Sequence, residues 1–101
     1  MLFEKIQKAN LDYDKVELDL QNLDLEQQAL KNKINSYYIK ISRNPMKRDT
    51  FMRDIEKAQA TYKVNEKMKQ QFTTKKQQLE ETLKKLKDAL ADSVKKKYGG
   101  K

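Results

Sequence analysis

The chain has 101 residues, of which 38% are charged, and it contains two Gly, one Pro and no Cys, His or Trp. So short a chain forms at most one domain with a thin core, and this composition is typical of long, solvated helices and not of sheets. The missing residue types exclude a disulfide framework, a catalytic thiolate and a zinc site, so we expect no metal, no cofactor and a reducing, cytoplasmic setting.

A continuous helix is predicted over residues 2–42. Apolar side chains recur there at alternating steps of four and three residues, which is the heptad repeat of a coiled coil, and only Gln27 interrupts the row. A 3.5-residue period kept over this length requires a facing helix. We call this row seam 1, and it consists of Leu2, Ile6, Ala9, Tyr13, Val16, Leu20, Leu23, Gln27, Leu30, Ile34, Tyr37 and Ile41.

A second apolar row follows the same helix on the side away from seam 1. It consists of Leu11, Leu18 and Leu25, with Ile39 in phase. Leucines on a side that normally faces water predict cover by another helix, so we expect these residues to form an oligomer interface in a homodimer. Scattered surface leucines are the alternative.

A bend is predicted at residues 43–47. Pro45 disfavours helical geometry at Asn44 and can begin a new helix, with Asn44 as its cap. The second helix then runs over residues 48–98 and is followed by a flexible tail at 99–101. The predicted fold is therefore all-α: a single domain, 1–101, in which two long helices form an antiparallel coiled-coil hairpin that assembles into a dimeric helical bundle.

The facing row on the second helix, seam 2, is polar in its middle. Asn65, Lys69 and Lys76 occupy core positions there, where polar residues weaken apolar contact and often fix the register. Seam 2 consists of Phe51, Ile55, Ala58, Tyr62, Asn65, Lys69, Phe72, Lys76, Leu79, Leu83, Leu86 and Leu90.

Positive charge is concentrated around the bend. Residues 4–26 hold three Lys and seven acids, residues 31–63 hold nine basic residues and three acids, and the remainder of the chain holds eleven basic residues and five acids. Such a cluster attracts a polyanion, which can be an anionic membrane leaflet, nucleic acid or an acidic protein surface. An ordinary solvated lysine-rich face is the alternative. The candidate membrane-binding residues are Lys31, Lys33, Lys40, Arg43, Lys47, Arg48, Arg53 and Lys57.

Two stretches of the chain suggest a family. Residues 11–16 read Leu-Asp-Tyr-Asp-Lys-Val, and residues 54–62 read Asp-Ile-Glu-Lys-Ala-Gln-Ala-Thr-Tyr, with Asn65 following. They resemble segments of the second and third long helices of BAR domains of the amphiphysin and arfaptin kind. The resemblance implies an arm-like portion of those two helices, with the bend as the arm tip that contacts anionic lipid headgroups. By location, it assigns this contact to Lys40, Arg43, Lys47, Arg48 and Arg53.

Catalysis is not expected. Paired acids such as Asp12 and Asp14 diverge on a helix, and a thin coiled coil offers no cleft. We therefore predict a non-enzymatic protein, peripheral at membranes, that binds an anionic lipid membrane through the bend and scaffolds or senses curvature as BAR arms do. A coiled-coil adaptor or holdase that binds a protein client through its open end, residues 89–98, is the main alternative. Nucleic acid is less favoured, because Tyr37, which could stack on bases, lies on seam 1.

Overall fold

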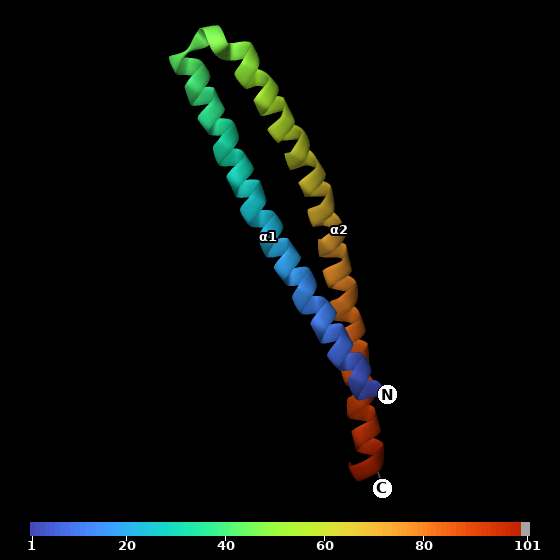
Figure 1. Cartoon of the computed structure of the whole chain (residues 1–101). Coiled ribbons are helices and arrows are strands. Elements are labelled where there is room, and N and C mark those ends of the chain that lie inside the picture. Colours follow the sequence, from blue (N-terminus) through green and yellow to red (C-terminus); the bar gives the residue numbers. More distant parts are fainter. Residues whose placement is uncertain (100–101) are drawn as a thin grey trace. The chain divides into compact units, whose positions relative to one another are not determined.

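The computed structural model describes residues 1–99, and it consists of two long helices joined by a short turn (Figure 1). Helix α1 spans Leu2–Arg43, a 3₁₀ turn spans Pro45–Lys47, helix α2 spans Arg48–Val94, and a π-helical turn spans Lys95–Gly99. The predicted all-α antiparallel hairpin is confirmed. The second α-helix ends four residues before the predicted end at 98, because the chain widens into the π-helical turn. Of the predicted tail, Gly99 belongs to that turn, and residues 100–101 lie outside the described residues.

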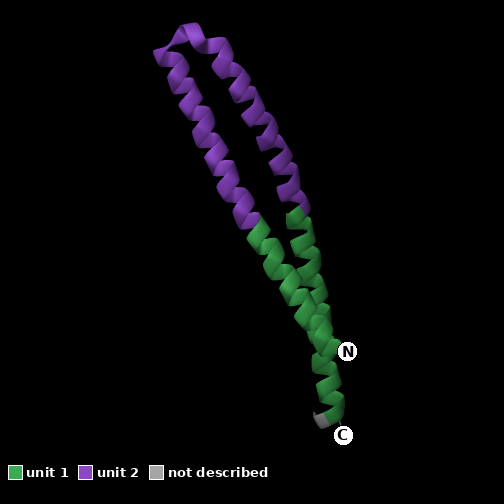
Figure 2. Ribbon diagram, viewed as in Figure 1, with its two compact units in different colours: residues 1–19, 72–101 green, residues 20–71 purple. Residues whose placement is uncertain are grey.

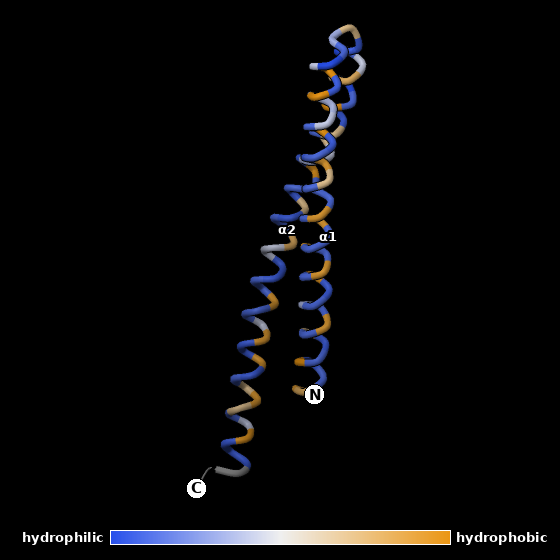
Figure 3. The backbone as a smooth tube through the Cα atoms, turned by 90° about the vertical axis from the view of Figure 1, so that its left-hand side faces the viewer, coloured by the Kyte–Doolittle hydropathy of each residue, from blue (hydrophilic) through white to orange (hydrophobic). Residues whose placement is uncertain are grey.

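The chain divides into two compact units, each containing a segment of both helices (Figure 2). Unit 1 consists of Met1–Asp19 with Phe72–Lys101, and unit 2 consists of Leu20–Gln71. Apolar positions recur at regular intervals along α1 and α2 (Figure 3). Every residue of seam 1 and of seam 2 is buried or half-buried, so the heptad pattern correctly identified the contact surface of each helix.

In unit 1 the seams form an apolar cluster. Ile6 and Ala9 of α1 are buried together with Leu83 of α2. Leu2, Tyr13, Leu86 and Leu90 pack against these three residues. In unit 2, Ile55 is completely buried, and the rings of Tyr37 and Phe51 lie 6.0 Å apart between their centroids. Burial of these side chains is what holds the two helices together, because neither helix buries apolar surface by itself.

Backbone hydrogen bonds stabilise the bend, and no side-chain cap contributes to it. Asn44 has φ −141° and ψ 77°, the non-helical geometry expected before Pro45, and its N–H donates to the carbonyl of Lys40. The carbonyl of Asn44 accepts the N–H of Lys47 at 3.1 Å. The predicted capping role of the Asn44 side chain is wrong, since that side chain makes no capping hydrogen bond. Pro45 has no N–H to cap, and the N–H of Lys47 is already paired with the backbone carbonyl of Asn44.

The second apolar row of α1 lies away from the helix contact, as predicted. Its exposed fractions are 70% at Leu11, 56% at Leu18 and 68% at Leu25. The homodimer predicted to cover these leucines stays a prediction. Within residues 1–99, neither helix is apolar over a stretch long enough to cross a bilayer.

Candidate functional site

A cluster of exposed basic side chains surrounds the bend. All eight predicted binding residues are exposed, and all belong to unit 2. Arg43 ends α1, Lys47 ends the 3₁₀ turn and Arg48 begins α2 (Figure 1). Together with the nearest cation on each helix, they form the basic tip, which we define as Lys40, Arg43, Lys47, Arg48 and Arg53.

The other three predicted residues lie farther along the helices. At about 1.5 Å of rise per residue, Lys31 lies about 18 Å along α1 from Arg43, and Lys57 lies about 14 Å along α2 from Arg48. Lys33 is one half-turn beyond Lys31 toward the bend. A surface that touches the bend end-on does not reach these three lysines. The structure therefore divides the predicted site into the basic tip and three separate lysines.

The cations of the basic tip are not neutralised by carboxylates. Among residues 1–99, none of the five forms an ion pair, although Asp49 and Asp54 lie in the same stretch. Residues 40–54 thus carry five positive and two negative side chains, a net charge of +3. The ammonium group of Lys40 lies 5.4 Å from the ring centroid of Tyr37 and 6.0 Å from that of Phe51. These cation–π contacts hold the lysine at the tip without cancelling its charge.

Met46 is a feature of the tip that the sequence reasoning missed. It lies in the 3₁₀ turn between Pro45 and Lys47, and its side chain is 96% exposed. Met46 belongs to neither seam, so the heptad pattern gives it no role. The signal that could have identified it is an apolar residue placed directly after the only proline, with basic residues on both sides.

Two ion pairs link the helices, and their side chains are between 30% and 57% exposed. Glu17 pairs with Lys76 at 3.3 Å in unit 1, and Asp24 pairs with Lys69 at 2.6 Å in unit 2. The second pair lies seven residues farther along α1 and seven residues earlier in α2 than the first, which is one heptad in each direction of an antiparallel helix pair. The hydrogen bond with Asp24 raises the pKa of Lys69, and the hydrogen bond with Glu17 raises the pKa of Lys76. Both lysines therefore keep their charge to a higher pH than an isolated lysine does.

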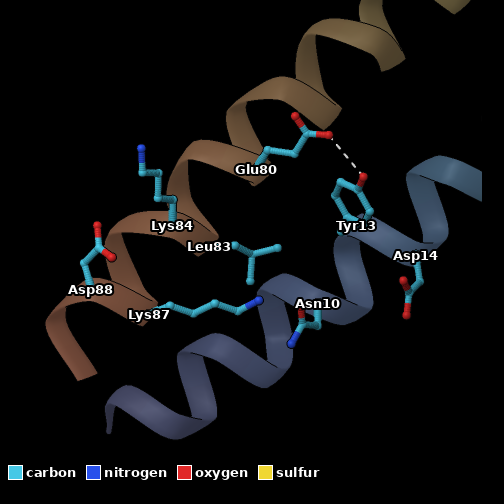
Figure 4. Close-up of a pocket in the computed structure, with 8 residues that line it drawn as sticks. All are labelled: Asn10, Tyr13, Asp14, Glu80, Leu83, Lys84, Lys87 and Asp88. Atoms are coloured by element: carbon cyan, nitrogen blue, oxygen red, sulfur yellow. Dashed lines mark hydrogen bonds between the residues drawn. The ribbon is translucent and has the colours of Figure 1, made fainter. Parts of the chain in front are cut away.

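A third polar contact borders a surface pocket of about 570 Å³ in unit 1 (Figure 4). There the hydroxyl of Tyr13 donates to Oε1 of Glu80 at 3.1 Å. Partial burial and then this hydrogen bond raise the pKa of Tyr13. Figure 4 shows Tyr13 and Glu80 facing each other across the helices, while Lys84 and Asp88 extend away from α1. The hydrogen bond between Tyr13 and Glu80 thus joins the two helices at the wall of the pocket. Charged side chains of both signs line the rest of it.

Two buried amides occupy the core of unit 2. Gln27 is 5% exposed, and its Nε2 donates to the carbonyl of Tyr62 and to Oε1 of Glu66, both at 3.0 Å. Asn65 is 6% exposed, and its Nδ2 has no hydrogen-bond partner. Among residues 1–99, no group of three acidic side chains is arranged to hold a metal ion. The polar contacts between the helices serve helix pairing, and the exposed basic tip is the better candidate for binding a partner.

Comparison of the chain with models of protein families, with curated proteins and with solved structures gave no match. The resemblance to BAR domains thus rests on the two sequence stretches alone. Tyr13 in the first stretch and Ile55, Ala58 and Tyr62 in the second lie on the seams, where coiled-coil packing already accounts for apolar and aromatic residues. The tip cations that the resemblance assigns are exposed, and coiled-coil packing gives no reason for them.

Proposed function

We propose that the chain is a non-enzymatic coiled-coil protein that binds anionic membrane surfaces through its basic tip. The observation that carries this proposal is the set of five exposed cations around the bend, none of which is paired with a carboxylate among the described residues. A Lys or Arg near an anionic membrane surface contributes about 1 kcal/mol of attraction. Five such residues acting together are enough for reversible attachment at physiological salt.

Helix stability alone explains only part of this charge. Lys40 and Arg43 lie in the last turn of α1, where cations stabilise the negative end of the helix dipole. Arg48 is at the positive end of α2, where a cation is unfavourable, and Arg53 lies beyond the first turn. The cations on the α2 side of the bend are therefore better explained by an external anionic partner.

The curvature-scaffolding role of BAR arms requires one further step. A curved surface can be imposed on a membrane by an assembly that presents two tips, so this role depends on dimer formation. Leu11, Leu18 and Leu25 supply an exposed apolar row that supports such a dimer. We include curvature scaffolding or sensing in the proposal on that condition.

The proposal is tested by co-sedimentation with vesicles that contain either no anionic lipid or a high fraction of it, at low and physiological salt. The tip variant is Lys40→Glu, Arg43→Glu, Lys47→Glu and Arg48→Glu. The matched control reverses four exposed lysines of α2 outside the tip, Lys67→Glu, Lys75→Glu, Lys85→Glu and Lys87→Glu. Each set lowers the formal net charge from +8 to 0, so the two variants differ in where the charge is removed.

We expect the native chain to sediment only with anionic vesicles and to lose binding as salt rises. The tip variant should stay in the supernatant while the control variant still binds. Equal loss in both variants would mean that total charge and not the tip determines binding. Native chain that stays in the supernatant under all conditions would overturn the membrane proposal, as would preference for a nucleic acid duplex over anionic vesicles at equal salt.

A protein client is the second candidate. Val94 near the end of α2 is 49% exposed, and α2 there extends beyond Leu90, the last residue of the unit 1 cluster. An exposed apolar side chain followed by Lys95, Lys96 and Lys97 suits an acidic client surface. In this case, deletion of residues 92–101 would abolish suppression of aggregation of an acidic model client, and the tip variant would not affect it.

A further inference from the structure

We propose that Met46 inserts into the apolar edge of the bilayer when the basic tip docks on an anionic membrane. This inference rests on the proposed function and adds a second, apolar contribution to the electrostatic one. At 96% exposure, Met46 leaves almost its whole side chain in contact with water. Isolated exposed apolar residues are common on protein surfaces, so exposure by itself identifies nothing. The position of Met46 in the bend distinguishes it.

The turn holds Met46 at a fixed place. The ring of Pro45 restricts φ on one side, and the N–H of Lys47 is bonded to the carbonyl of Asn44 on the other. The backbone N–H of Arg48, at the start of α2, donates to the carbonyl of Pro45. Both hydrogen bonds enclose Met46 within one short turn, so its side chain is presented from an ordered backbone. Less conformational entropy is lost on binding when the binding residue is already positioned.

The cations beside Met46 give the tip the arrangement that a membrane interface requires. Arg43, Lys47 and Arg48 lie within three residues of Met46 and are all exposed. Long basic side chains can keep their charged ends among lipid phosphates while their stems and a neighbouring apolar group lie deeper. Methionine is flexible and adapts to an irregular apolar environment. The charge complementarity of these three cations with anionic headgroups is the reason to choose the bilayer as the occupant.

The absence of tryptophan from the chain allows a direct test. Met46→Trp introduces a single fluorophore at the tip. Val64→Trp is the matched control, because Val64 is also exposed, at 57%, and lies about 24 Å along α2 from Arg48 at about 1.5 Å per residue. Each variant is titrated with anionic vesicles, with and without lipids brominated near the headgroup, and its binding is measured in parallel by co-sedimentation.

On binding, we expect Trp fluorescence of the Met46 variant to shift to shorter wavelength and to be quenched by the brominated lipid. The Val64 variant should bind equally well and show neither change. Binding of both variants without a change at the tip would overturn the insertion while leaving electrostatic docking intact. A change at Val64 equal to that at the tip would also overturn it, in favour of side-on docking. If the native chain does not bind anionic vesicles at all, both the insertion and the proposed function are overturned.

A second variant measures the contribution of the native methionine. Met46→Ser should weaken partitioning to anionic vesicles about tenfold, which corresponds to removal of a partly buried apolar side chain from the lipid. The fold-change should be the same at low and physiological salt, because it does not involve charge, whereas the loss in the tip variant should shrink as salt rises. Helical content measured by circular dichroism should not change, since Met46 contacts neither seam. An affinity equal to that of the native chain would contradict the proposal.

Discussion

Asn65 is the residue whose replacement should most increase the stability of the hairpin. It occupies a core position of seam 2, is 6% exposed and leaves Nδ2 without a partner. Asn65 belongs to unit 2, as does Leu23 of seam 1, which is also buried. Leucine has the same branching and the same number of side-chain heavy atoms as asparagine. Asn65→Leu should therefore fit between the helices without a large rearrangement.

The size of the effect follows from three terms. A buried donor without a partner destabilises the folded state by about 1–3 kcal/mol, and burying a leucine side chain stabilises it by about 1.5–3 kcal/mol. Tighter packing around the two methyl groups offsets part of this gain by about 1–3 kcal/mol. A net increase of about 2 kcal/mol in the free energy of unfolding is expected, which corresponds to a rise in Tm of about 10 °C for a chain of this size.

Gln27→Leu is the matched control, because Gln27 is equally buried and also leaves one amide atom, Oε1, without a partner, but its Nε2 makes two hydrogen bonds. Its replacement removes the unpaired Oε1 but loses about 0.5–1.5 kcal/mol for each of the two bonds and leaves the carbonyl of Tyr62 without this donor, so its gain in stability should be smaller than that of Asn65→Leu. Urea denaturation followed by circular dichroism gives both values, with the m-value as a check that the same surface is exposed. An Asn65→Leu variant that is no more stable than the Gln27→Leu variant would show that the unpaired amide is not a liability, and the reasoning would fail.

Two further predictions concern pH and assembly. The pKa values of Lys69, Lys76 and Tyr13 are raised in the folded state, so their stabilising contribution is present below about pH 10 and is lost as pH rises through the folded pKa values. Tm measured from about pH 8 to about pH 11 should therefore fall more steeply for the native chain than for the double variant Lys69→Met, Lys76→Met; parallel curves would contradict this. Sedimentation equilibrium should show a dimer that dissociates in the triple variant Leu11→Gln, Leu18→Gln, Leu25→Gln with no loss of helix, and a native chain that is monomeric throughout would exclude the predicted homodimer.

The fold was predictable because one physical rule, apolar contact every 3.5 residues, governs most of the chain. It placed all the seam residues correctly, even the polar ones, and proline placed the bend to within one residue of the end of α1. The failure at Asn44 has a local cause. A cap prediction considers side-chain type, whereas a 3₁₀ turn pairs its donors through backbone geometry that residue type alone does not determine.

The binding site was only partly predictable. Counting charge along the sequence grouped eight cations, but a helix separates residues by about 1.5 Å each, so Lys31, Lys33 and Lys57 lie away from the tip. Met46 was missed for a related reason. Periodicity describes helices, and a three-residue turn has none, so the exposure of its central residue becomes visible only in the structure.

The sequence separation of the helix contacts decreases steadily toward the bend, and this has a consequence for folding. The bond from Tyr13 to Glu80 spans 67 residues and that from Gln27 to Tyr62 spans 35, whereas Tyr37 and Phe51 meet across the turn itself. Closing a short loop has the smallest entropic penalty, so pairing should begin beside Pro45 and proceed layer by layer toward the chain ends. Thermal opening should run the other way. The docking end would then be the first part of the hairpin to form and the last to separate.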